Sequence, residues 1–264
     1  MDIERGVYGS LPYAALGSGS PLVVLAGLMP VTGVAGDALV NSVVRSLLPL
    51  ARSRRLVVFN RRAGLPRGMT MAELAGEHAD ALRDAFDVPV DLIGTSTGGS
   101  IAAQLSADHG DRIARLVLVS AACRLGPSGR ALQARVAESI RNGRHRRAAA
   151  TAAAGLVPPR RGKSAAALTG WILASRLVPN PQDWADMATT IEAEDGFDLA
   201  ACPTSIRAPT LIVAGRDDRF YGPALFEETA HLIPNSRLEL IVGRGHITVT
   251  RDRRFIRTLA GFLA

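Results

Sequence analysis

Six short apolar runs recur along the chain, and stretches of helical character separate them. Most of the runs are continuous and rich in Val, Leu and Ile, which is typical of strands buried on both faces of a parallel sheet. Strands that alternate with helices favour right-handed crossovers and helices on both faces. The sequence therefore predicts an α/β fold with a mostly parallel, doubly wound sheet. The runs occupy residues 21–27, 55–60, 90–94, 115–121, 209–215 and 237–243.

The domain organisation is predicted from the points where the alternation of strands and helices begins and where it is interrupted. Residues 6–20 carry Gly/Ser turns and predict a strand pair ahead of the sheet. Thr70 and Glu73 form a predicted capping box at the start of a helix. After residue 123 the chain becomes rich in Ala and Arg and lacks a convincing central strand. We expect one core, residues 1–123 and 206–264, with a helical cap or lid inserted at 124–205.

A serine stands between two glycines just after the apolar run at 90–94. Gly94 and Gly98 flank Ser96 at equal distance, which suits a sharp strand-to-helix turn, because larger side chains there would collide with the strand and the helix. Such a turn exposes the serine hydroxyl above a sheet, where a base and a substrate carbonyl can reach it. An ordinary Gly/Ser/Thr loop has the same local sequence, so the wider context has to decide.

Three segments together resemble the α/β-hydrolase family. "DLIGTSTGG" is similar to that family's nucleophile elbow, "APTLIVAGRDD" to the strand and acid turn that follow its cap, and "VGRGHIT" to its histidine loop. The order serine, aspartate, histidine along the chain is also that of the family. The resemblance covers the sheet segments on both sides of the insertion and implies an α/β-hydrolase fold with a helical cap.

The resemblance implies a catalytic triad of Ser96, Asp218 and His246. The imidazole would take the proton of the serine hydroxyl, and the carboxylate would fix the tautomer of the imidazole and stabilise its charged form. The family places the acid three residues after the glycine that ends the strand, here Gly215, which favours Asp218 over Asp217. The weaker candidates are Asp195 and Asp198 for the acid, and His78, His109, His145 and His231 for the base.

An oxyanion hole needs two fixed backbone donors. The amide of Thr97 is expected to be the first, and by resemblance the amide of Leu28 is the second. The chain departs from the family at residues 26–27, where Ala-Gly replaces the common His-Gly pair. It departs again in "NRRAGLPRG", where Asn60 stands first in place of aspartate and Ala63 stands where glycine is common. A backbone donor survives the first change, although the hydrogen bonding of a histidine side chain does not, and the second change bears on the subfamily more than on catalysis.

The expected function is a serine hydrolase that cleaves a carboxylic ester of a small or medium organic molecule through an acyl-enzyme. Neither a metal nor an organic cofactor is implied. The same resemblance also covers lactone, thioester, amide and carbon–carbon bond hydrolysis, and acyl transfer. A non-catalytic ligand-binding protein on the same fold is the alternative from another class. The sequence leaves the substrate and the oligomeric state open.

The balance of charge invites a nucleic-acid or anionic partner, but composition argues against one. The formal net charge is +7 from 31 basic and 24 acidic residues, and Lys163 is the only lysine, so arginine dominates as in a GC-rich genome. Aromatic residues make up only 5%, and no base-stacking motif occurs. Basic residues of the cap either gather an anionic substrate or form a solvated face. They are Arg141, Arg144, Arg146, Arg147, Arg160, Arg161 and Lys163.

Cellular location is expected from what the sequence lacks. No run of about 18 apolar residues occurs, and the first residues have no apolar segment of the kind that a signal peptide needs. Cys123 and Cys202 stand far apart without a pattern typical of disulfides or zinc. We expect a cytoplasmic protein that acts on a small molecule and has no membrane or nucleic-acid partner.

Overall fold

A sheet of eight strands forms the centre of the protein. The computed structural model describes residues 2–156, 162–178, 180–202 and 206–264. The strand order is β1-β2-β4-β3-β5-β6-β7-β8. β1 and β4 each pair antiparallel with β2, and every other pair is parallel, which confirms the predicted fold class. The strands are β1 (Glu4–Tyr8), β2 (Leu11–Leu16), β3 (Ser20–Leu25), β4 (Arg54–Phe59), β5 (Val90–Thr95), β6 (Ile113–Val119), β7 (Thr210–Gly215) and β8 (Ser236–Ile241).

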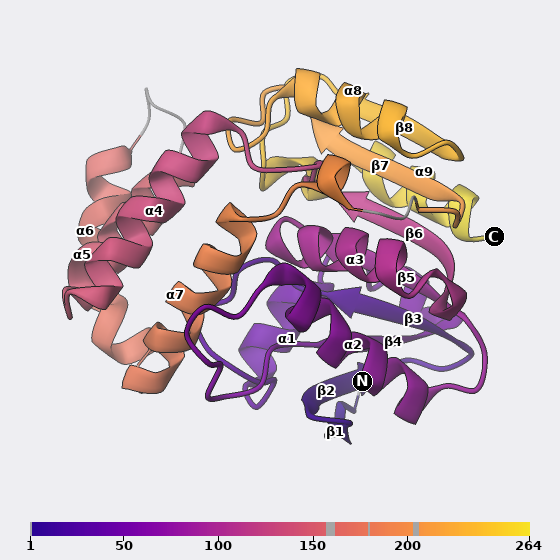
Figure 1. Ribbon diagram of the computed structural model, residues 1–264, viewed down its shortest axis with the longest axis horizontal. Coiled ribbons are helices and arrows are strands. Elements are labelled where there is room, and N and C mark those ends of the chain that lie inside the picture. The colour runs from indigo at the N-terminus through magenta and orange to yellow at the C-terminus, as the bar shows by residue number, and fades with distance from the viewer. Residues whose placement is uncertain (1, 157–161, 179, 203–205) are drawn as a thin grey trace.

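Helices cover both faces of the sheet, which explains why its strands are apolar on both sides (Figure 1). Leu25 and Leu92 belong to the core on one face, and their neighbours Val24 and Ile93 belong to the core on the other face. The first core is closed by α2 (Met71–Ala85), α3 (Thr97–Asp108) and α8 (Pro223–Leu232). The second is closed by α1 (Asp37–Val44) and α9 (Arg253–Leu263).

Helix α2 begins at the predicted capping box. The Thr70 hydroxyl accepts a hydrogen bond from the amide of Glu73 at 3.2 Å, and the Glu73 carboxylate accepts one from the amide of Thr70 at 2.7 Å. This reciprocal pair satisfies two of the free amides at the helix start. Within the described ranges no helix is long and apolar enough to cross a membrane. Single 3₁₀ turns lie at Leu50–Arg52, Gly110–Arg112, Leu199–Ala201 and Thr248–Arg251.

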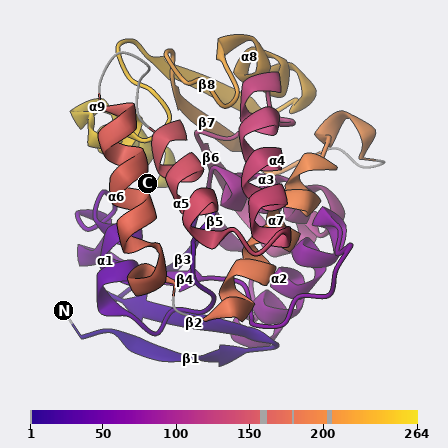
Figure 2. The same cartoon turned by 90° about the vertical axis from the view of Figure 1, so that its left-hand side faces the viewer.

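In the described part of the segment between β6 and β7, four α-helices form a separate layer at one end of the sheet (Figures 1 and 2). Val136, Trp184 and Ile191 are buried in an apolar cluster of their own, against which Leu28 and Val31 of the core pack. The helices are α4 (Pro127–Arg141), α5 (His145–Gly155), α6 (Lys163–Leu177) and α7 (Pro181–Asp195). Arg160, Arg161 and the expected end of the insertion at 203–205 lie outside the described residues.

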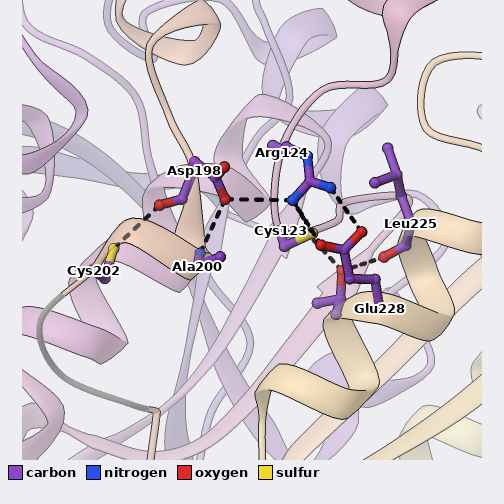
Figure 3. A network of polar contacts seen from close by, with 8 residues as sticks. Cys123, Arg124, Asp198, Ala200, Cys202, Leu225 and Glu228 are labelled. Carbon is purple, nitrogen blue, oxygen red and sulfur yellow. Dashed lines mark hydrogen bonds and ion pairs between the residues drawn. The ribbon is translucent and has the colours of Figure 1, made fainter.

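The chain leaves the core and returns to it at neighbouring points (Figure 3). The Arg124 guanidinium donates to both carboxylate oxygens of Glu228 on α8, at 2.7 and 2.8 Å. It also lies 3.6 Å from the carboxylate of Asp198, at the end of the insertion. The amide of Leu199 donates to the carbonyl oxygen of Cys123 at 2.8 Å. These contacts join the two ends of the insertion to each other and to the core.

Candidate active site

Ser96 occupies a tight turn between β5 and α3. Its backbone has φ 52° and ψ −125°, a conformation that is rare for a residue with a side chain. A Cβ on Gly94 would lie 2.4 Å from the carbonyl oxygen of Gly98, and a Cβ on Gly98 would lie 2.3 Å from that of Ala26. Only glycine therefore fits at both positions, as the spacing predicts.

Ser96, His246 and Asp218 form a continuous chain of hydrogen bonds. Ser96 Oγ lies 2.9 Å from His246 Nε2, and His246 Nδ1 lies 2.8 Å from Asp218 Oδ2. The three residues follow β5, β8 and β7, so they meet at the carboxyl ends of the parallel strands. Because the Asp218 carboxylate can only accept, Nδ1 carries a proton and Nε2 of a neutral ring is free to accept from the serine. The arrangement can deprotonate Ser96 during attack on a carbonyl carbon.

The two adjacent aspartates differ in their surroundings. The Asp218 side chain is fully buried, and its Oδ1 accepts hydrogen bonds from the amides of Phe220 at 2.8 Å and Tyr221 at 3.4 Å. Asp217 is exposed. The structure thus brings Asp218, and not Asp217, to His246. The weaker candidates bind elsewhere: Asp195 pairs with Arg130 and Asp198 lies beside Arg124.

The other four histidines lie in ordinary structural positions. His78 is buried in α2, where its Nδ1 lies 2.7 Å from the carbonyl oxygen of Leu74 and burial lowers its pKa to about 4. His109 ends α3, His145 begins α5 and His231 lies in the last turn of α8. His246 is therefore the histidine that the fold brings to Ser96.

Two contacts around His246 were not predicted. The Ser120 hydroxyl donates to the carbonyl oxygen of His246 at 2.9 Å, from a residue with φ 46° just after β6. The ring of Phe220 stacks on the imidazole with ring centroids 4.4 Å apart. A small polar residue at the end of a buried strand was the only sequence signal for Ser120. Together the two contacts restrict the histidine loop and the orientation of the ring.

The segment expected to carry the second oxyanion donor lies against Ser96. A Cβ on Gly27 would be 3.3 Å from Ser96 Cβ, and Leu28 and Thr97 line the same cavity as Ser96. Buried Arg61 donates to the carbonyl oxygen of Met29 at 2.8 Å, and burial lowers the pKa of Arg61 to about 10. This hydrogen bond restrains the loop that contains Leu28 and Met29.

The departure at Asn60 has a physical reason. The Asn60 side-chain amide donates to the carbonyl oxygens of Val31 at 2.9 Å and Gly33 at 2.8 Å. Its carbonyl oxygen accepts from the amide of Arg61 at 2.9 Å. An aspartate carboxylate has no proton to donate to those two carbonyl oxygens. Asparagine at position 60 therefore stabilises the loop of Val31 and Gly33, which follows Leu28 in the chain.

A cavity of about 530 Å³ opens over Ser96 and His246. Its walls come from the loop after β3, from α1, from α4, α5 and α7, from the loops that follow β7 and β8, and from the start of α9. Apolar side chains predominate in the lining, and no Asp, Glu, Lys or Arg is among the described residues that line it. Its polar side chains, besides Ser96 and His246, are Ser42, Ser46, Thr95, Thr97, Gln133 and Thr250. The lining includes Leu28, Leu132, Gln133, Val136, Ile191 and Phe220.

Two curated proteins are similar to parts of the chain. It is 42% identical over 82 residues to the polyketide synthase ThaQ of Burkholderia thailandensis. The matched segment is 30% of this chain and 4% of that protein. It is 38% identical over 74 residues to the putative carbamate hydrolase RutD of Pseudomonas savastanoi pv. phaseolicola, which covers 28% of this chain and 29% of that protein. The match thus spans less than a third of either relative.

Solved structures agree with the fold along the whole chain. The enol-lactonase from Burkholderia xenovorans LB400 superimposes with a TM-score of 0.74 at 22% identity, over 98% of this chain and 99% of that chain. At that identity the likeness shows the fold. The family model described as the alpha/beta hydrolase fold matches residues 59–250, which is more than half of the chain. The chain therefore belongs to the alpha/beta hydrolase fold family.

Proposed function

We propose that the protein is a serine hydrolase that cleaves carboxylic esters of small or medium organic molecules through an acyl-enzyme. One observation carries the proposal: Ser96 Oγ lies 2.9 Å from His246 Nε2, and the opposite ring nitrogen lies 2.8 Å from the buried Asp218 carboxylate. Membership of a hydrolase-fold family supports a hydrolytic reaction. The type of bond is the finer part of the proposal.

The reaction would proceed in two halves. Ser96 Oγ attacks the ester carbonyl carbon while His246 Nε2 takes its proton, and the amides of Thr97 and Leu28 stabilise the negative charge on the carbonyl oxygen. His246 then gives the proton to the departing alcohol, which leaves the acyl group on Ser96. In the second half a water molecule loses a proton to His246 and attacks the acyl carbon, and His246 returns this proton to Ser96 Oγ as the acid leaves.

The cavity supports a substrate with a neutral, apolar acyl group. Leu132, Val136 and Ile191 of the cap face the same 530 Å³ space as Ser96. Burying a charged group among such side chains without a partner would cost several kcal/mol. An acyl chain of moderate length fits this lining better than a polar or charged one.

A lactone is the second candidate for the bond. The structural neighbour named an enol-lactonase shares the fold over nearly the whole chain. A lactone is a cyclic ester, so the same attack by Ser96 opens its ring, and the leaving alcohol stays attached to the acyl group. Thioester, amide and carbon–carbon bond cleavage use the same nucleophile and belong in the same assay.

The test is a substrate panel assayed with the wild type and with Ser96→Ala. The panel contains p-nitrophenyl esters of increasing acyl length, lactones, thioesters and an aryl-diketone acid. We expect hydrolysis of esters and a loss on the order of 10⁴-fold or more in Ser96→Ala, with the fold intact. Equal activity in Ser96→Ala would contradict the mechanism. Absence of an adduct on Ser96 after treatment with a fluorophosphonate would favour a non-catalytic binding protein.

A further inference from the structure

A buried carboxylate of the cap lies directly behind the nucleophile turn. Glu194, in the last turn of α7, has no exposed surface. Its Oε2 accepts from Thr97 Oγ1 at 2.7 Å and from Gln133 Nε2 at 2.9 Å. Its Oε1 accepts from Ser100 Oγ at 2.8 Å and from the Tyr221 hydroxyl at 3.2 Å. Two donors on each oxygen satisfy the carboxylate without a cation.

Two of these donors hold the first turn of α3. That turn consists of Thr97, Gly98, Gly99 and Ser100. Since glycine has no side chain, the only polar side-chain groups of the turn are the hydroxyls of Thr97 and Ser100. Both hydroxyls donate to Glu194. The turn follows Ser96, whose backbone is strained, and it contains the Thr97 amide of the proposed oxyanion hole. Glu194 is therefore the polar anchor of this turn.

The third donor, Tyr221, lies in the loop after β7 that also carries Asp218. The Tyr221 amide donates to Asp218, and the Tyr221 ring stacks beside the imidazole of His246 with centroids 5.9 Å apart. Burial, followed by the charge of Glu194, raises the pKa of Tyr221 well above its usual value. The phenol thus stays protonated and remains a donor to Glu194. The fourth donor, Gln133, belongs to the wall of the cavity on α4.

We infer that Glu194 is a positioning residue: through Thr97 and Ser100 its carboxylate fixes the turn that carries the Thr97 amide of the oxyanion hole. The inference rests on the proposed function, because that function gives the amide its role. It also makes the cap a part of the catalytic machinery, in addition to being a wall of the substrate cavity. Glu194 is not among the residues that line the cavity, so it acts through the residues that it holds.

The direction in which Glu194→Gln changes the reaction rate distinguishes positioning by hydrogen bonds from a direct effect of the carboxylate charge. A carboxylate behind the turn repels the negative charge that develops on the substrate oxygen. If its charge dominated, Glu194→Gln would speed the reaction. If its hydrogen bonds dominate, the same substitution slows the reaction, because the NH2 that replaces one carboxylate oxygen cannot accept from the two donors that share this oxygen in the wild type. We expect the slower reaction.

The rate of covalent labelling of Ser96 by a fluorophosphonate measures this effect without knowledge of the natural substrate. Phosphonylation also places negative charge on an oxygen, so it depends on the same amides. We expect Glu194→Gln to lower the second-order labelling rate by about 10-fold or more. Thr97→Val removes one donor and leaves Glu194 in place, and it should also slow labelling. The double variant should lose less than the product of the two single losses.

Asp186→Asn is the matched control. Asp186 lies on the same helix, is equally buried, and accepts from the amides of Gly64 and Leu65 at 2.9 Å each. We expect it to lower the melting temperature as Glu194→Gln does, while its labelling rate stays within about twofold of the wild type.

The outcomes separate the inference from the proposed function. Slower labelling in Glu194→Gln and Thr97→Val, but not in Asp186→Asn, supports positioning. Wild-type labelling rates in both variants, or an equal loss in Asp186→Asn, would overturn the inference and leave the proposed function standing. A wild-type protein that is not labelled at Ser96 would overturn the proposed function, and the inference with it.

Discussion

The hydroxyl of Ser120 donates a hydrogen bond to the carbonyl oxygen of His246, and the two oxygens are 2.9 Å apart. Ser120 follows β6, whereas His246 follows β8, and β7 lies between these strands in the sheet. The bond therefore ties the histidine loop to the strand ends beside it. It acts on the backbone of His246 and leaves both ring nitrogens to Asp218 and Ser96.

We predict that Ser120→Ala lowers kcat by about 3- to 10-fold with KM within twofold, because one neutral hydrogen bond contributes about 1 kcal/mol. Ester hydrolysis by the purified variant is the measurement. Ser106→Ala is the control, since the Ser106 hydroxyl is also buried and donates to the backbone oxygen of Ala102 at 2.7 Å. Equal kcat losses in the two variants would count against a role for Ser120 in holding the histidine.

The two neighbouring aspartates offer a sharper comparison. Asp218→Asn should lower kcat on the order of 10⁴-fold, because an amide in place of the carboxylate no longer fixes the tautomer of His246. Asp217→Asn changes an exposed residue and should leave kcat within about twofold. Steady-state kinetics of both variants checks the order. The opposite ranking would move the acid by one position.

The buried His78 should make the protein less stable in mild acid. Burial lowers its pKa from 6.5 to about 4 in the folded protein, so the unfolded chain binds the proton more readily. The contribution of His78 is therefore complete above pH 6.5 and declines as the pH falls towards 4. Its full size is about 3 kcal/mol.

Replacement of His78 by Leu should remove that part of the pH dependence. The free energy of unfolding would be measured by urea denaturation at several pH values between 4 and 7. His231→Gln is the control, because His231 is exposed on α8. If the slope of stability against pH in His78→Leu equalled that of the wild type, another group would have to be responsible.

The arginines of the cap should matter little for a neutral substrate. Arg141 pairs with Glu192 at 2.6 Å, and the Arg146 guanidinium lies 4.7 Å from the centre of the Trp171 ring. We predict that kcat/KM for a neutral short-chain ester changes less than about twofold between low salt and roughly 0.5 M, because exposed charges do not steer a neutral substrate and their screening by salt therefore leaves its rate unchanged.

An acidic substrate provides the opposing outcome for the same assay. A preference for that substrate over its neutral analogue, lost in salt or in an Arg146→Ala, Arg147→Ala double variant, would indicate that the cap gathers anions. The search for the natural substrate would then move to anionic acyl compounds.

The sheet and the turn at Ser96 could be predicted because each depends on a short-range constraint. Continuous apolar runs are needed where helices cover both faces, and Gly94 and Gly98 stand where a Cβ would lie within 2.4 Å of a backbone oxygen. The capping box at Thr70 likewise involves residues three positions apart. Apolar runs, flanking glycines and capping residues can therefore be recognised in a single sequence.

The supporting contacts could not be predicted because they join residues far apart in the chain. "IEAEDG" contains three acidic residues in helix α7 and its end, and nothing local distinguishes them. Glu192 pairs with Arg141 and Asp195 with Arg130, whereas Glu194 is buried among hydroxyls. The difference depends on how the helix rotates against the core, which the weak periodicity of α7 does not reveal.

The junction at Arg124 has a consequence for engineering. Because Arg124 joins Asp198 to Glu228 of the core, the two ends of the insertion are neighbours (Figure 3). A cap transplanted from a relative could thus replace α4–α6 without moving the strands on either side. The best place to splice such a chimaera is before α7, since that choice keeps Glu194, whereas a splice after α7 would exchange substrate preference and the support of the Thr97 turn together.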